Sequence, residues 1–476
     1  MNVRILGRLT LAALFGCRFL SAQTVFIEDL APAPFNGPGS GVIWRGVYYF
    51  QGTALRRSDG TVAGTSVVKD FGSGNGSPVY FFPFTAARDY IAFARTDADG
   101  KPQVWVSDGT DAGTSPLMDI DAVNGAASGN VFYFLGIGQI WKTDGTPGGT
   151  GLLKVFDPGG GTGVVPYGPM VGSHGSVFFA ADFGGGSQLW TSDGTVEGTV
   201  ALAPADSVAP SYGFGLPILF DVNGTVFFSA VGGHELWRTD GTPGGTARVK
   251  RVSGGLGNLS SAMGKLFFVA ADSRDELQVW SSDGTETGTR ALTGPESPGW
   301  GRGFEDCLAG CVWDSILGLT TGGDAVYFFA IDPKTREYYL WTSDGTDGGM
   351  RKLVRVRFES GGQNLPSVEA SVRDGILYFV SDDGVQGVGL WRSDGTVAGT
   401  FMVLDFSPVA VGLSIWGIVP APRGVFFGSS ASGDARLWYL PAIQPAKPGP
   451  SFAPRPRSRS AGAQDGADDA RTSNAP

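Results

Sequence analysis

Histidine and cysteine are scarce in this chain of 476 residues, which contains two histidines and three cysteines. Metal centres and catalytic sites built from several of these side chains therefore have little to draw on. Cys307 and Cys311 form a CxxxC pair that is too sparse for a zinc site. In an exported chain, such a pair predicts one small local disulfide that pins a loop.

Basic residues and long apolar runs are also in short supply. Lysine and arginine total 35 against 45 aspartates and glutamates, which gives a net charge of −10. An acidic surface argues against nucleic acid and against anionic membranes as partners. Beyond the N-terminal segment, no run of roughly 18 apolar residues occurs, so we expect no transmembrane segment.

The N-terminal segment has the pattern of an export signal. Arg4 and Arg8 precede the apolar run LTLAALFG, which is followed by LSA. We therefore predict a signal peptide over residues 1–22, with cleavage after Ala22, and an extracellular or cell-surface location. The alternative is lipid attachment at Cys17, because LFGC resembles a bacterial lipoprotein box.

Glycine and phenylalanine are abundant, at 76 and 32 residues. This composition is typical of many short strands joined by tight turns. With 42% hydrophobic residues, the chain is too apolar to be mostly disordered. Residues 443–476 differ, because they are rich in proline, alanine and serine with mixed charges, and we predict that they form a disordered tail.

One motif is repeated eight times. Its DGT triplet begins at Asp59, Asp108, Asp144, Asp193, Asp240, Asp283, Asp344 and Asp394. Tryptophan stands three residues before the aspartate in seven copies, at Trp105, Trp141, Trp190, Trp237, Trp280, Trp341 and Trp391. The first copy has Arg56 there. An aliphatic residue comes one place earlier, Ser or Thr directly precedes the aspartate, and a second glycine follows it by five residues. Threonine then follows this glycine except in the seventh copy, which has Met350.

Each repeat contains about four short strand signals. One lies upstream of the motif, as in VYYF, one within it, one downstream, as in TSVVKDF, and a weaker one in the spacer. Repeats of about 40–50 residues with four strands are the signature of propeller blades. The sequence therefore predicts an all-β, closed β-propeller over residues 23–442, of the kind that needs no partner chain, and we expect a monomer.

The ends of the repeat region indicate how the ring closes. Residues 425–442 contain two strand signals but no DGT, with Pro441 in place of the aspartate. The missing strand is matched by TVFIEDL at residues 24–30, which has the pattern of TSVVKDF. We therefore predict nine blades, with the N-terminal strand completing the last and removing exposed sheet edges. Eight blades are the alternative if the short repeat around Asp144 does not form its own.

The motif has a structural explanation. Asp-Gly is a turn signal, because glycine tolerates positive φ and aspartate bonds nearby amides. The preceding Ser or Thr can make similar local bonds. We expect the second glycine also to adopt positive φ where the chain re-enters a strand. Tryptophan and its aliphatic neighbour face opposite sides of one strand, so both sides should be covered.

The segment HELWRTDGTPGGT at residues 234–246 contains the whole motif. On this motif the chain resembles the ELWxxDGT-repeat family of exported bacterial proteins over about residues 24–440. The resemblance implies a propeller and carries no established reaction. Arg56, Met350 and the last unit without DGT depart from the pattern, so we expect those blades to be atypical.

Signals for chemistry are few. His174 and His234 lie in predicted turns, and no GxSxG elbow occurs. The repeated aspartates occupy the same turn position, which indicates architecture rather than catalysis, so no catalytic residue and no cofactor are predicted. Calcium is the alternative at TDADGK, residues 96–101, but Lys101 stands where an oxygen ligand is needed.

The longest spacer, residues 294–319, is the candidate binding loop. It carries Trp300, Trp313, Glu305, Asp306 and Asp314, together with both cysteines. Long loops on rigid scaffolds often bind partners, and exposed tryptophans stack on sugars or fill pockets. The alternative is an insertion whose tryptophans pack on the blade beneath.

These observations favour an exported, non-catalytic module that binds or scaffolds protein or envelope polysaccharide. A propeller enzyme acting on polysaccharide, as a glycoside hydrolase or lyase with paired carboxylates, is the first alternative. A purely structural surface protein is the second.

Overall fold

The computed structural model of the protein describes residues 25–29, 41–51, 54–72, 84–97, 99–156, 166–182, 187–202, 219–230, 233–274, 276–292, 316–332, 334–358, 368–382, 387–405, 414–431 and 434–442. The predicted signal peptide with Cys17 and the predicted tail lie outside these residues. So does most of the candidate binding loop.

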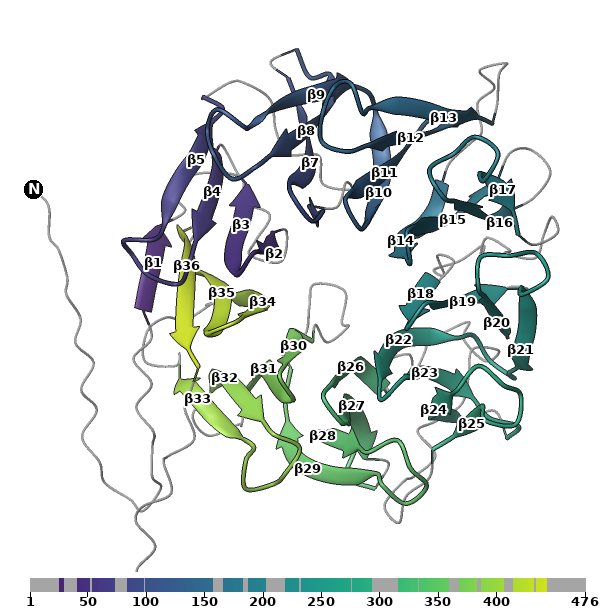
Figure 1. The fold of residues 1–476 in the computed structure, drawn as a ribbon. Helices are drawn as coiled ribbons and strands as arrows, with labels where there is room; N and C mark the ends of the chain where they lie inside the picture. Colours follow the sequence, from purple (N-terminus) through teal and green to yellow (C-terminus); the bar gives the residue numbers. More distant parts are fainter. Residues whose placement is uncertain are drawn as a thin grey trace, which may run out of the picture. The chain divides into compact units, whose positions relative to one another are not determined.

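The described strands form nine four-stranded antiparallel sheets, arranged as the blades of a β-propeller (Figure 1). Blades 1 to 3 are β2 (Val42–Trp44), β3 (Val47–Gln51), β4 (Ala54–Ser58) and β5 (Ser66–Asp70); β6 (Thr85–Ala86), β7 (Ile91–Thr96), β8 (Pro102–Ser107) and β9 (Ser115–Asp119); and β10 (Ala122–Ser128), β11 (Val131–Gly136), β12 (Gln139–Thr143) and β13 (Gly151–Val155). Blades 4 to 6 are β14 (Pro166–Ser173), β15 (Ser176–Asp182), β16 (Ser187–Ser192) and β17 (Val200–Ala201); β18 (Leu219–Val222), β19 (Thr225–Ala230), β20 (Glu235–Thr239) and β21 (Ala247–Arg251); and β22 (Gly257–Ala262), β23 (Lys265–Ala271), β24 (Leu277–Ser282) and β25 (Arg290–Ala291). Blades 7 to 9 are β26 (Ile316–Gly322), β27 (Ala325–Asp332), β28 (Glu337–Ser343) and β29 (Arg351–Val356); β30 (Ala370–Arg373), β31 (Ile376–Asp382), β32 (Val388–Ser393) and β33 (Phe401–Asp405); and β34 (Ser414–Ala421), β35 (Gly424–Ala431), β36 (Asp434–Pro441) and β1 (Val25–Asp29).

The blade count confirms nine and excludes the eight-blade alternative. The short repeat around Asp144 forms its own sheet, in the order β10-β11-β12-β13. This repeat is short because its loops are short: only Ile137 and Gly138 separate β11 from β12. A blade therefore needs no more than the four strands and their turns.

The core is divided among the interfaces between blades. The buried apolar residues of the described chain fall into nine clusters, and each cluster draws on two neighbouring blades. The interface between blade 9 and blade 1 is one of them, with Tyr48 and Phe50 packed against Phe426, Leu437 and Tyr439. Apolar side chains are therefore packed at every interface between blades, including the one between blades 9 and 1.

The aliphatic residue of the motif is the most regularly buried position. It is fully buried in all eight copies, at Leu55, Val104, Ile140, Leu189, Leu236, Val279, Leu340 and Leu390. The tryptophan beside it lies directly opposite a phenylalanine of the second strand, as in the pairs Phe93↔Trp105 and Phe328↔Trp341. The two rings stack in most blades, with centroids 6.3 Å apart in both of these examples. The tryptophan and its aliphatic neighbour therefore point to opposite faces of the blade and join different core clusters, as Trp280 and Val279 do.

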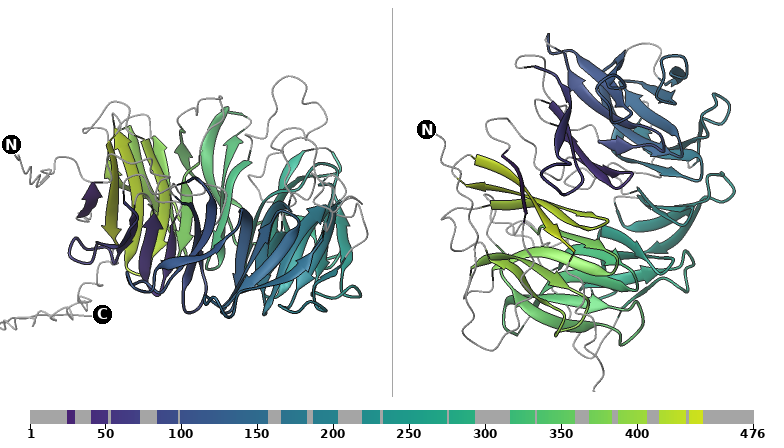
Figure 2. Two further views of the ribbon diagram at one scale, coloured as in Figure 1. Left: turned by 90° about the horizontal axis from the view of Figure 1, so that it is seen from above. Right: turned by 60° about the vertical axis from the view of Figure 1, so that its left-hand side comes forward.

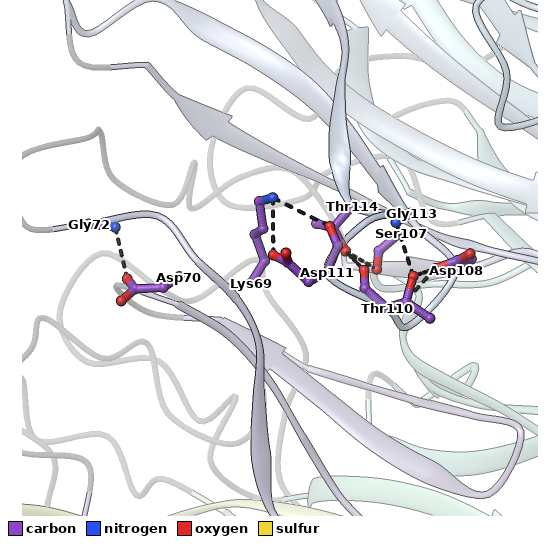
Figure 3. A network of polar contacts seen from close by, with 9 residues as sticks. All are labelled: Lys69, Asp70, Gly72, Ser107, Asp108, Thr110, Asp111, Gly113 and Thr114. Carbon is purple, nitrogen blue, oxygen red and sulfur yellow. Dashed lines mark hydrogen bonds and ion pairs between the residues drawn. The ribbon is translucent and has the colours of Figure 1, made fainter.

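Seven of the eight DGT turns are held by the same closed set of hydrogen bonds, which Figure 3 shows for blade 2. The amide and hydroxyl of Thr110 both donate to Asp108 Oδ1, at 2.9 and 2.7 Å, and the amide of Gly113 donates to the Thr110 hydroxyl. Thr114 donates to the Thr110 carbonyl, so Ser107 must donate to Thr114 while it accepts from the amide of Gly109. The repeated serine, aspartate and threonine side chains thus all have partners inside the turn.

The two glycines of the motif are required for different reasons. The glycine of DGT has positive φ in every copy, from 75° at Gly345 to 94° at Gly241. The second glycine does not, so the expectation of positive φ there was wrong. It is needed for space instead, because a β-carbon on Gly245 would lie 2.0 Å from Asp240 Oδ1, and the other copies are similar.

The DGT glycine also joins neighbouring blades. In every copy it lies against an aromatic ring of the preceding blade, where a β-carbon would come within 2.6–3.4 Å of that side chain. The pairs are Gly60 with Tyr439, Gly109 with Tyr49, Gly145 with Tyr90, Gly194 with Tyr133, Gly241 with Phe178, Gly284 with Phe227, Gly345 with Phe267, and Gly395 with Tyr327. The first pair spans blades 9 and 1.

Met350 changes the network in blade 7. Its side chain is 1% exposed and belongs to the apolar cluster between blades 6 and 7. The amide of Gly349 donates to the carbonyl of Thr346 rather than to its hydroxyl. The turn keeps the bonds to Asp344 but exchanges the hydroxyl chain for apolar contact.

β1 pairs antiparallel with β36, from Val25↔Tyr439 to Asp29↔Arg436. This register is the one that the sequence pattern at residues 24–30 predicts. Whether this strand holds the ring closed, beyond the packing between blades 9 and 1, stays a prediction.

We expect Gly245→Ala to lower the free energy of unfolding by about 1–3 kcal/mol, because its β-carbon collides with the Asp240 carboxylate. The adjacent Gly244 is the matched control, because a β-carbon there meets no atom within 4 Å. Gly244→Ala should change stability by no more than about 0.5 kcal/mol. Denaturant unfolding of both variants tests this, and equal losses would contradict the steric role.

We expect removal of residues 23–30 to lower the melting temperature, because β36 would then become an exposed sheet edge. The same chain should aggregate at a lower concentration than the full chain, which light scattering measures. An unchanged melting temperature would show that packing between blades 9 and 1 closes the ring without the strand.

Candidate functional site

The blades present two faces, which the side view in Figure 2 separates. In an antiparallel four-stranded blade, the first and third turns lie at one end and the second turn at the other. The DGT turns therefore share one face, which we call the motif face, with the turns between first and second strands. The connections between blades leave from the opposite face, which we call the connection face.

The repeated aspartates are exposed on the motif face, but their carboxylates already accept hydrogen bonds within the turn. Hydrogen bonds from the following threonine, chiefly from its hydroxyl, hold the pKa below its ordinary value of 3.8 in seven copies: Asp59, Asp108, Asp144, Asp193, Asp240, Asp283 and Asp344. These carboxylates are therefore ionised at neutral pH and serve as turn caps. None has the raised pKa that a general acid needs.

Lysines on the outer strands fasten neighbouring blades on this face. Lys69 reaches from β5 to Asp111 of the next DGT turn, with its Nζ 3.1 Å from Oδ1 (Figure 3). Lys154 and Lys250 occupy the same position in their blades and donate to the carbonyls of Thr199 and Glu286. These three lysines therefore link neighbouring blades.

His174 lies beside Ser173 and Asp221, and these three side chains have the composition of a hydrolytic triad. Their spacing in the sequence does not reveal this cluster. Ser173 donates to Asp221 Oδ1 at 2.6 Å, while its oxygen is 3.5 Å from His174 Nδ1. In a working triad the serine proton goes to histidine, and the aspartate accepts from histidine. Here the aspartate accepts the hydrogen bond from the serine hydroxyl, and the His174 ring lies against Gly224 of the next blade. The arrangement joins blades 4 and 5.

The calcium-like segment forms a hairpin turn. Asp97 Oδ1 accepts the amides of Asp99 and Lys101, at 2.9 and 2.8 Å, and Gly100 has a φ of 80°. The corresponding turns in blades 6 and 7 are capped in the same way by Asp272 and Asp332. Within the described ranges, no group of three or more His, Cys, Asp or Glu side chains could hold a metal ion.

The candidate binding loop lies mostly outside the described residues. This applies to Trp300, Glu305, Asp306, Cys307, Cys311, Trp313 and Asp314. The described chain leaves blade 6 at Leu292 and enters blade 7 at Ile316. Both points are on the connection face. His234 is on the same face, in the turn before β20.

No protein-family model matches the chain, and no curated protein matches it. Among solved structures, BamB from Moraxella catarrhalis is similar with 11% identity and a TM-score of 0.42, over 79% of this chain and 99% of that chain. Saccharomyces cerevisiae Sqt1 is similar with 10% identity and a TM-score of 0.41, over 79% and 98%. Similarities this low carry no conclusion about function. The described part of the chain has no helix long and apolar enough to cross a membrane.

The lowered aspartate pKa values predict an acid-sensitive fold. A carboxyl whose folded pKa is below its unfolded value stabilises the fold above the unfolded pKa, and that contribution is lost as pH falls through the folded pKa. The free energy of unfolding should therefore fall steadily below about pH 4.

Denaturant unfolding of the wild type and Asp240→Asn between pH 7 and pH 2.5 checks this. The variant should be less stable at pH 7, and the difference should shrink below pH 4. A difference that does not depend on pH would contradict the assignment.

Proposed function

We propose that this protein is an exported, non-catalytic propeller that binds or scaffolds a protein or polysaccharide of the cell envelope. One observation supports it most. The repeated polar residues are consumed by bonds inside the turns and between blades, so the ring is a rigid frame with no chemistry repeated on it. What such a frame offers is the non-repeated segments of its connection face.

Export is supported by the signal-like pattern of residues 1–22. The long spacer between Leu292 and Ile316 supports binding, because tryptophans in loops supply rigid apolar area at low entropic cost. The enzyme with paired carboxylates stays an alternative. Among the described residues, the one serine-histidine-aspartate cluster is bonded in the wrong order to favour hydrolysis.

An array of envelope proteins and polysaccharides, probed with the full chain, tests the proposal with and without calcium. We expect binding to at least one component. Trp300→Ala/Trp313→Ala should weaken it by about tenfold or more, if the loop supplies the main contacts.

The matched control is the triple change of Glu305, Asp306 and Asp314 to alanine, which removes the charges of the same loop and leaves its tryptophans. We expect this variant to keep binding. An array with no bound component would overturn the proposed function. Binding that survives the tryptophan changes would move the site elsewhere on the ring.

A further inference from the structure

A pocket on the connection face is lined by His234, Arg251, Val252 and Ser253. His234 is in the turn that precedes β20, and Arg251 ends β21, the outermost strand of the same blade. The amide of Val252 donates to the His234 carbonyl at 2.9 Å, and the amide of Leu256 donates to the carbonyl of Gly233 at 2.9 Å. Backbone bonds thus fix the wall of the pocket.

Arg251 differs from the polar residues at the same register position in blades 1, 2 and 7, which have partners within their own blade. The equivalent Asp119 accepts from Gln103 at 2.7 Å, and Arg355 donates to Glu337 at 2.8 Å. Asp70 accepts the amide of Gly72. Arg251 has no hydrogen bond or ion pair with any side chain among the described residues.

The described acids on the connection face of blades 5 and 6 already have partners. Glu235 is directly opposite it in the register of β20 and β21. Its Oε1 accepts from Arg248 at 3.1 Å and its Oε2 from the Trp237 indole at 3.0 Å. In the turn of blade 6 on the same face, Asp272 and Glu276 are both bound by Arg274. The pocket is thus a cationic site in a chain of net charge −10.

We propose that this pocket binds a single oxyanion group, such as a carboxylate, sulfate or phosphate, carried by an acidic surface polymer. A guanidinium fork, an imidazole and a hydroxyl are donors suited to such a group. The site deepens the proposed function and rests on it for the polymer. The pocket and the ends of the candidate binding loop share the connection face.

The two histidines of the chain make the test direct, because each gives one imidazole Cε1–H signal in NMR. The full chain is titrated with sodium glucuronate, with sulfate, with phosphate and with neutral glucose. We expect an oxyanion to shift the His234 signal saturably, while glucose does not and His174 stays constant. The preferred anion identifies the source as a carboxylated, sulfated or phosphorylated polymer.

Arg251→Gln should weaken this binding by about tenfold or more, because it removes a charge-assisted contact. Arg351→Gln is the control, because it makes the same change in net charge on an exposed residue that opens β29 on the motif face. Equal weakening by both variants, no saturable shift with any anion, or equal shifts of both histidines would overturn the proposal.

A second arm applies alginate, dextran sulfate and uncharged dextran to the same variants. Binding of an acidic polymer that Arg251→Gln abolishes would support the site on its natural class of ligand. If small anions bind but no component of the array does, the anion site would stand and the proposed function would be rejected. If Arg251→Gln does not affect binding on the array and no anion shifts the His234 signal saturably, the proposed function would stand and the pocket would be rejected.

Discussion

The contact between each DGT glycine and an aromatic ring of the preceding blade is the constraint on which the ring depends. The glycine must have positive φ to form the turn, and it must lack a side chain to let the ring approach, as at Gly109 against Tyr49. The aspartate network fixes the position of that glycine from within its own blade. Local hydrogen bonding and packing between blades therefore meet at one residue, and the stacking angle of successive blades is set there.

Much of this architecture can be predicted from the sequence, because a repeat reports its own period. The count of nine follows from eight motifs and a last unit that lacks one strand, and the sheet order β1-β36-β35-β34 confirms the pairing. The role of the second glycine could not be predicted, since spacing shows that a glycine is needed but not which atom excludes a side chain. In blade 2, the second strand has Ala92 where other blades have tyrosine or phenylalanine, and Tyr90 supplies the ring from three residues upstream of Phe93. A pattern of residue types does not reveal such a substitution across positions.

The candidate site was less predictable for a related reason. Motif searches find residues that recur or that match known spacings, and here those residues stabilise turns, as Asp97 and the DGT aspartates do. The Ser173 cluster shows the converse, because Asp221 comes from the next blade and is brought to Ser173 and His174 only by the ring. Their hydrogen bonds run from serine to aspartate, so proximity alone would have suggested a chemistry that the geometry does not favour.

A repeat protein provides its own internal controls, and this is the strongest reason to look for function at positions that break the pattern. Asp70, Asp119 and Arg355 show what a residue at this register position of an outer strand does when it serves the fold: it bonds within its own blade. Arg251 occupies the same position beside His234, and it has no side-chain partner among the described residues. Other cations on the outer strands either join neighbouring blades, as Lys69 and Lys250 do, or bond within their own blade, as Arg355 does. Arg251 does neither among the described residues, and this difference argues for a ligand. The same comparison predicts where specificity can change without cost to the fold: at the ends of the outer strands, on the connection face.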